Sequence, residues 1–115
     1  MRLLNAPDIE SFVMAKPAAA IHFDADWDKT YRTIVSRKMA DAEAVLGRQV
    51  NFGEVDCDSN PEVARSIPVL NVPLVAYYRH GKLVASLIGA EQNVQVVLEQ
   101  VLRGEEIQAT TPSSP

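Results

Sequence analysis

Cys57 is the single cysteine of the chain and its only candidate thiol nucleophile. A cysteine attacks as the thiolate, which forms most readily beside positive charge or at a helix N-terminus. Cys57 instead lies between Asp56 and Asp58, whose negative charges raise the pKa of a neighbouring thiol. We therefore interpret Cys57 as a structural residue at a strand end, and a reactive thiol is the alternative.

Alternating carboxylates at Asp24, Asp26 and Asp28 form a second candidate group. They match the opening of an EF-hand calcium loop, but Lys29 and Val35 stand where that loop needs glycine and a bidentate glutamate. An aspartate-dependent phosphatase motif also begins this way, yet the further lysine and acidic motifs of those enzymes are missing. One helix cap with solvated charges accounts for the triplet. We expect no metal site and no cofactor, with weak cation binding as the alternative.

Composition narrows the class of protein further. The chain has 115 residues, 47% of them hydrophobic and 23% charged, which predicts one globular domain. Its net charge is −4 and its basic residues are scattered, which argues against a nucleic-acid partner. One thiol, no signal peptide and no apolar run near the ~18 residues of a membrane span predict a cytoplasmic protein without membrane contact.

Hydrophobic patterning predicts the elements that hold these residues. A short apolar start at residues 2–4 precedes a helix over about 5–15, which has a proline near its start. Residues 18–23 form an apolar run around His22, which predicts a central strand buried on both faces. Apolar residues at helical spacing then predict a long amphipathic helix that Gly47 closes.

The second half of the chain predicts a strand, a short helix, a hairpin and a last helix. Residues 50–55 form the strand, and a helix opens at Asn60-Pro61 and ends near residue 67. Apolar runs at 74–78 and 83–88 flank turn residues that include His80-Gly81, which predicts a β-hairpin. A helix follows from Gln92, and the polar residues 104–115 predict a disordered tail after a domain over residues 1–103.

The resulting order, βαβαβαββα, predicts an α/β fold with a mixed central sheet and helices on both faces. This order and a set of short motifs resemble the thioredoxin family over about residues 2–103. The motifs are Ile21-His-Phe23-Asp-Ala25-Asp-Trp27, Val55-Asp56 with Asn60-Pro61, Val72-Pro73, and Gly81-Lys82 to Gly89-Ala90. The resemblance implies a thioredoxin-like three-layer sandwich.

The resemblance also implies a peptide-binding groove. Pro73 would be the cis-proline of the family, and the backbone of Val72 would pair with an extended peptide. The positions that match the partner-contacting surface of thioredoxins are Trp27, Asp28, Tyr31, Cys57, Val72, Pro73, Gly89 and Ala90.

The chain departs from the family directly after Trp27. Thioredoxins carry Cys-Gly-Pro-Cys there, and this sequence has Asp28-Lys29-Thr30-Tyr31. Dithiol exchange needs an attacking thiolate and a second thiol that resolves the mixed disulfide. Because both are missing, we expect no catalytic residues, and Asp28 becomes a helix cap that contributes about 1 kcal/mol.

His22 stands where many thioredoxins bury an aspartate. The favoured interpretation is a core histidine hydrogen-bonded to a neighbour. The alternative is a pH-responsive group in contact with Tyr31 or Asp56.

The sequence therefore predicts a redox-inactive thioredoxin-like protein that binds a protein or peptide, as a chaperone or assembly factor does. A basic partner would suit the aspartates at the strand ends. One alternative is a thiol-disulfide or glutathione-linked redox activity at Cys57, and a role in cell redox homeostasis rests on the resemblance alone. Another is a homodimer in which a second copy covers the groove.

Overall fold

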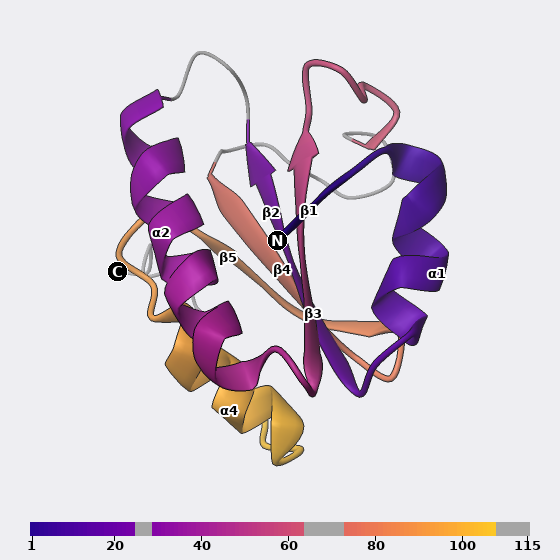
Figure 1. The fold of residues 1–115 in the computed structure, drawn as a ribbon, viewed down its shortest axis with the longest axis vertical. Helices are drawn as coiled ribbons and strands as arrows, with labels where there is room; N and C mark the ends of the chain where they lie inside the picture. Colours follow the sequence, from indigo (N-terminus) through magenta and orange to yellow (C-terminus); the bar gives the residue numbers. More distant parts are fainter. Residues whose placement is uncertain (25–28, 64–72, 108–115) are drawn as a thin grey trace.

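The computed structural model describes residues 1–24, 29–63 and 73–107, and Figure 1 shows their arrangement. The sequence-based expectations for Trp27, Asp28, Val72, most of the helix up to residue 67 and the tail beyond residue 107 lie outside the described residues. The elements are β1 (Arg2–Leu4), the short 3-10 helix η1 (Ala6–Asp8), α1 (Ile9–Met14), β2 (Ala18–Asp24), α2 (Lys29–Leu46), β3 (Val50–Asp56), β4 (Leu74–Arg79), β5 (Lys82–Ile88) and α4 (Val94–Leu102).

The strands form one mixed sheet in the order β1-β3-β2-β4-β5. β1, β3 and β2 run parallel, whereas β4 pairs antiparallel with β2 and β5 antiparallel with β4. Helix α1 packs on one face of the sheet, and α2 and α4 pack on the other (Figure 1). The prediction of a three-layer α/β sandwich is confirmed.

β2 lies at the centre of the sheet and is buried along its whole length. Its side chains alternate between two hydrophobic clusters: Ala18 and Ala20 face the layer of α2 and α4, and Ile21 and Phe23 face the layer of α1. A strand covered on both faces needs apolar residues at successive positions. This requirement explains the continuous apolar run that predicted the strand.

The β4–β5 hairpin is confirmed, with each strand one residue longer at the turn than predicted. Its turn residues His80 and Gly81 have φ angles of 50° and 82°. A two-residue turn with positive φ at both positions matches the right-handed twist of the strands it joins. Gly81 also lies under the side chain of Met14, whose Cγ would be 2.8 Å from an added Cβ.

Helix boundaries differ from the sequence-based expectations at two places. The first predicted helix is divided into η1 and α1. The last helix begins at Val94 rather than at Gln92, because the Asn93 side chain accepts a hydrogen bond from the backbone N–H of Val96 and caps it. Among the described helices, none is long and apolar enough to cross a membrane.

Candidate functional site

Several predicted groove residues meet at the end of the sheet where β2 and β3 finish. The backbone N–H of Cys57 donates to the carbonyl oxygen of Asp24 at 2.8 Å. Phe23 pairs with Leu74, so Pro73 lies at the same end, and its carbonyl oxygen accepts a hydrogen bond from the N–H of Gly89 at 2.9 Å. The sheet register thus brings Cys57, Pro73 and Gly89 to one edge.

The flanks of this edge differ in exposure. Pro73 is buried, whereas the Tyr31 side chain in the first turn of α2 is 55% exposed. Gly89 has a φ of +105°, and nothing lies within 4 Å of the position that a Cβ would take. The Nζ of Lys38 donates to the carbonyl oxygen of Ala90 at 2.5 Å, which ties the middle of α2 to the segment after β5. Trp27, Asp28 and Val72 lie outside the described residues, so the cis geometry of Pro73 stays a prediction.

The Cys57 thiol is half-buried and in an electrostatic environment that opposes ionisation. Burial is the main cause, and the charges of Asp24, Asp56 and Asp58 add to it; together they raise the pKa of Cys57 to about 11. The upward shift in the thiol pKa that the flanking aspartates predict is confirmed. The larger contribution, burial, could not be read from the neighbours in sequence.

The acidic residues at this edge are less accessible to a basic partner than the sequence indicates. Asp24 is fully buried. The side chain of Asp56 accepts hydrogen bonds from the backbone N–H of Asp58 and the hydroxyl of Ser59, both at 3.0 Å, and so organises the turn after β3. Asp58 is exposed.

A partly buried polar cluster lies between the first half of α2 and the sheet, and we define it as His22, Asp24, Arg32, Ser36 and Glu54. The Nδ1 of His22 lies 3.3 Å from Oε2 of Glu54, and the same oxygen accepts a hydrogen bond from the Ser36 hydroxyl at 2.9 Å. The Nε of Arg32 lies 2.9 Å from Oδ2 of Asp24. Both carboxylates of the cluster therefore have a basic side chain beside them.

The two carboxylates of the polar cluster have pKa values that move in opposite directions. Burial raises the pKa of Asp24 to about 6, although His22 and Arg32 oppose this effect. The contact with the His22 imidazole, followed by the hydrogen bond from Ser36, lowers the pKa of Glu54 against the effect of burial. Asp24 is thus the more easily protonated of the two acids.

Sequence reasoning placed His22 in the core but did not find its partners. His22 is fully buried, as expected, and its neighbour is Glu54 rather than Tyr31 or Asp56. The residues that were missed are Glu54, Arg32 and Ser36. A signal for Glu54 exists, because alternation along β3 puts it on the same face as the buried side chains of Val50 and Phe52. Only the pairing of β3 with β2 shows that this face meets His22.

The polar cluster also contains donor atoms of the kinds that bind metals. One ligand atom each from His22, Asp24 and Glu54 lies within 4.8 Å of the others. Arg32 already supplies a positive charge 2.9 Å from Asp24, so a cation would have to compete with the guanidinium for that carboxylate. The cluster is therefore described as an internal polar network in which Arg32 pairs with one of the two carboxylates.

Comparisons with known proteins agree on the relationship of the chain. The family model described as thioredoxin matches residues 2–102. Three similar solved structures are the thioredoxins of Malassezia sympodialis (16% identity, TM-score 0.72, 93% of this chain and 91% of that one), Plasmodium falciparum (18%, 0.73, 90% and 98%) and the mitochondrial thioredoxin 3 of Saccharomyces cerevisiae (20%, 0.73, 90% and 93%). No curated protein matches the chain. At such low identities the structural likeness establishes the fold.

Proposed function

The chain belongs to the thioredoxin family, and from this membership we propose that it binds an extended segment of a partner protein without performing dithiol chemistry, as a chaperone or assembly factor does. One observation carries the proposal: the chain has a single cysteine, Cys57, and has Asp28 and Tyr31 where thioredoxins have their two redox cysteines. A dithiol exchange cannot be completed with one thiol in the chain.

The state of Cys57 supports a binding role over a monothiol redox role. With a pKa raised to about 11, the thiol is almost entirely protonated at neutral pH. The half-buried sulfur is also poorly placed to meet a bulky disulfide. A glutathione-linked activity at Cys57 would need the opposite environment.

The groove edge supports an extended peptide as the ligand. Tyr31 presents an exposed aromatic ring, and Gly89 leaves open space next to the segment that ends at Ala90. Aromatic side chains of this kind often anchor peptides at interfaces. The exposed carboxylate of Asp58 favours a segment with basic residues, mainly by speeding encounter. We also propose a cytoplasmic location, because one unpaired thiol suits a reducing compartment.

The redox half of the proposal is tested by insulin reduction in the presence of dithiothreitol. The protein should give no turnover above the rate with reductant alone, and Cys57→Ser should behave identically. A rate above this background that disappears in Cys57→Ser would establish the monothiol alternative and reject a redox-inactive protein.

The binding half is tested by amide NMR titration with a short peptide of alternating Lys and Val. We expect chemical-shift changes at Tyr31, Cys57, Gly89 and Ala90, and weaker binding in Tyr31→Ala. Val45→Ala is the matched control, because Val45 is also exposed on α2 but lies near its other end. Shifts at the groove that grow with protein concentration in the absence of peptide would show a homodimer instead.

A further inference from the structure

The polar cluster contains buried polar atoms that make no hydrogen bond. The side chains of His22 and Asp24 are fully buried. Neither ring nitrogen of His22 and neither carboxylate oxygen of Asp24 forms a hydrogen bond with a described residue, and their contacts with Glu54 and Arg32 meet the distance of an ion pair alone. Buried polar atoms nearly always have a partner, which is a protein atom, an ordered water or an ion. These four atoms therefore need a further partner inside the cluster.

Three of the side chains in the cluster surround one point. His22 and Asp24 are two residues apart on β2, so both side chains lie on the same face of the sheet. Glu54 pairs with His22 in the parallel register of β2 and β3, which places its side chain on that face as well. One ligand atom from each of the three lies within 4.8 Å of the others. Two adjacent strands in the middle of the sheet thus hold one imidazole and two carboxylates together.

The spacing of His22 and Glu54 fits two ligands of one tetrahedral metal ion. The Nδ1 of His22 lies 3.3 Å from Oε2 of Glu54. Zn²⁺ binds imidazole nitrogen and carboxylate oxygen at about 2.0–2.1 Å, which puts two such ligands about 3.3–3.4 Å apart at a tetrahedral angle. The Ser36 hydroxyl donates to the same oxygen of Glu54 at 2.9 Å, and contacts of this kind orient carboxylate ligands. A small rotation of the Asp24 side chain would bring in the third ligand.

The charges in the cluster also favour a cation. Asp24 and Glu54 contribute two negative charges when ionised, and Arg32 contributes one positive charge. A neutral histidine adds none, so one negative charge is left over. The register of β2 and β3 adds Asp56, whose Cα pairs with that of Asp24. Because charge inside a protein is poorly solvated, a divalent cation would stabilise this arrangement.

Arg32 leaves the site accessible to an ion. Its Nε lies 2.9 Å from Oδ2 of Asp24, so Oδ1 of that carboxylate remains for a metal. The Arg32 side chain is 35% exposed and the Glu54 side chain is 21% exposed. The guanidinium can therefore move toward solvent, and an ion can reach the cluster from the side of these two residues. A path for the ion is one requirement of a metal site.

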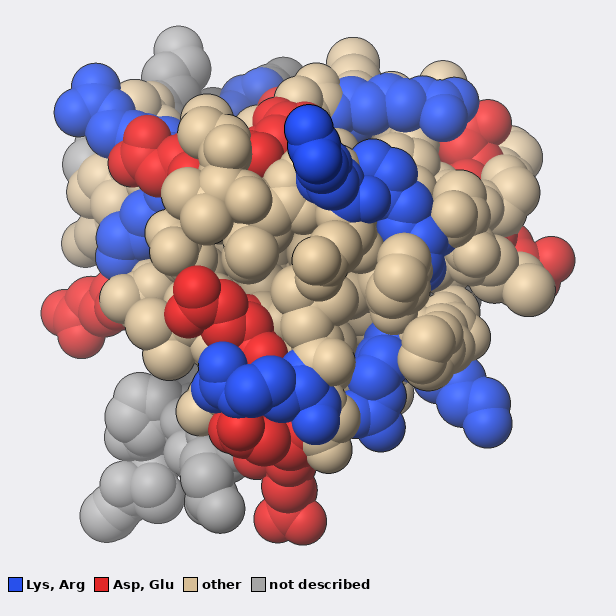
Figure 2. Space-filling model, turned by 60° about the horizontal axis from the view of Figure 1, so that its bottom comes forward, with Lys and Arg blue, Asp and Glu red and all other residues tan. Residues whose placement is uncertain are grey.

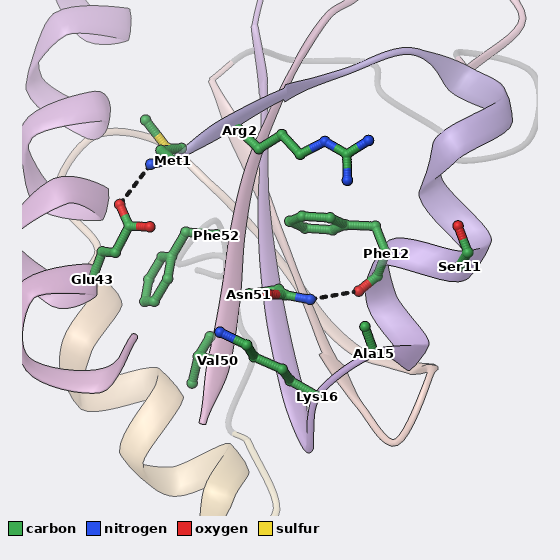
Figure 3. A pocket seen from close by; sticks show the side chains of 10 residues that line it. All are labelled: Met1, Arg2, Ser11, Phe12, Ala15, Lys16, Glu43, Val50, Asn51 and Phe52. Carbon is green, nitrogen blue, oxygen red and sulfur yellow. Dashed lines mark hydrogen bonds and ion pairs between the residues drawn. The ribbon is translucent and has the colours of Figure 1, made fainter. Parts of the chain in front are cut away.

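Other acidic residues of the described chain lack such a set of donors. Figure 3 shows a cavity of about 570 Å³ at the start of β3, where the one lining carboxylate, Glu43, is paired with the amino group of Met1 at 2.7 Å. On the face drawn in Figure 2, the side chains of Asp and Glu are interspersed with those of Lys and Arg. In the part of the chain that the structure describes, His22, Asp24 and Glu54 are the one group of three potential ligands that lie this close.

We propose that His22, Asp24 and Glu54 bind one divalent transition-metal ion of the Zn²⁺ type. Mg²⁺ and Ca²⁺ prefer oxygen ligands alone, so the imidazole favours a metal that accepts nitrogen. The ion links β2 to β3 beneath α2 and stabilises the folded protein, because the three ligands come together only in the fold. This site differs from weak cation binding by the alternating aspartates, since two of its three ligands lie outside that triplet.

The first test is isothermal titration calorimetry with ZnCl₂ at pH 7.5. The protein carries no polyhistidine tag, and its metal is removed with EDTA, which is then dialysed away. One Zn²⁺ should bind per chain, and MgCl₂ should give no comparable heat. Glu54→Gln and Asp24→Asn should each weaken Zn²⁺ binding by at least about tenfold, because each replaces a charged ligand by an amide of the same shape. Glu10→Gln is the matched control, since it removes the same charge at an exposed position on α1.

Two further measurements identify the ligands. The chain has two histidines, and His80 lies exposed in the hairpin turn. In NMR spectra of the imidazole nitrogens, Zn²⁺ should shift the signals of His22 and leave those of His80 in place. Cys57→Ser should bind Zn²⁺ as tightly as the original protein. Excess Zn²⁺ should raise the melting temperature of the original protein by at least about 5 °C, and it should not do so for Glu54→Gln.

Five outcomes would reject the metal site. If no Zn²⁺ binds, buried waters are the partners of His22 and Asp24 instead. The proposal is also wrong if Mg²⁺ binds as well as Zn²⁺, if His80 shifts instead of His22, if Cys57→Ser abolishes binding, or if Glu54→Gln binds like the control. Thermal melting without metal verifies that each variant is folded. No peptide takes part in these measurements, so their result is independent of the proposed binding function.

Discussion

At the scale of single residues, Asp24 holds a negative charge at a position where burial opposes it. Its pKa is about 6 in the folded protein and 3.8 as the ordinary value, so between these pH values the folded state keeps a proton that the unfolded chain has released. The free energy of unfolding should therefore decrease as pH rises from about 4 to about 6, by up to about 3 kcal/mol.

Asp24→Asn should remove this decrease, because the amide cannot ionise. The measurement is urea unfolding of both proteins from pH 4 to pH 8, with Asp41→Asn as a control at an exposed position. Glu54 acts in the other direction and in a lower range: its pKa is lowered, so its contribution is lost as pH falls through that value. An Asp24→Asn variant with an unchanged pH dependence would contradict this assignment.

Cys57 should react slowly with iodoacetamide in the native protein. A pKa near 11 against an ordinary value of 9.0 leaves about a hundredfold less thiolate at pH 8 than the unfolded chain has. The comparison is the alkylation rate of native protein and of protein in urea, followed by mass spectrometry. Asp58→Asn should increase the native rate modestly, because one of the charges that raises the pKa is removed. A native rate equal to the unfolded rate would count against a protected thiol.

At the scale of elements, the contact of β1 and α1 with β3 depends on Gly53. A Cβ at this position would lie 2.6 Å from Cδ1 of Leu4 and 2.9 Å from Cε2 of Phe12. Both neighbours are buried in the cluster on the α1 face and have little room to move. Gly53→Ala should therefore reduce the free energy of unfolding by about 1–3 kcal/mol.

A double variant tests the cause of that loss. Leu4→Val shortens the closest side chain, so Gly53→Ala should cost less in the Leu4→Val background than in the original protein. The measurement is chemical unfolding of the original protein, both single variants and the double variant. Strictly additive effects would mean that a contact other than Leu4 limits the space at Gly53.

At the scale of the whole molecule, one hydrophobic contact is made by a residue that follows residue 103, where the sequence predicts that the domain ends. Ile107 packs against the cluster formed by α2, α4 and the sheet. A chain ending after Ile107 should keep the melting temperature of the full chain, whereas Ile107→Ala in the full chain should lose about 1 kcal/mol. Calorimetry of both proteins measures these changes. A large decrease in melting temperature on deleting residues 108–115 would show that the tail contributes to stability.

Much of the architecture could be predicted from the sequence, because local patterns of residue type indicate the individual strands and turns. The apolar run around His22 predicted the central strand β2, and the His80-Gly81 turn between apolar runs predicted the β4–β5 hairpin. Burial on both faces and positive φ angles restrict residue type at each position, so a single sequence reveals them. The lack of a second cysteine, on which the proposal of a redox-inactive protein rests, needs no structure at all.

The tertiary structure determined which residues that are distant in the sequence contact each other. Glu54 is distant from His22 in the chain, and only the parallel register of β2 and β3 brings the two side chains together. The pKa of Cys57 depends mainly on burial, which is a property of the packed molecule rather than of the flanking aspartates. The hydrophobic pattern of a strand shows which of its faces is buried, but the residue of a distant strand that lies beside it is known only once the strands have paired.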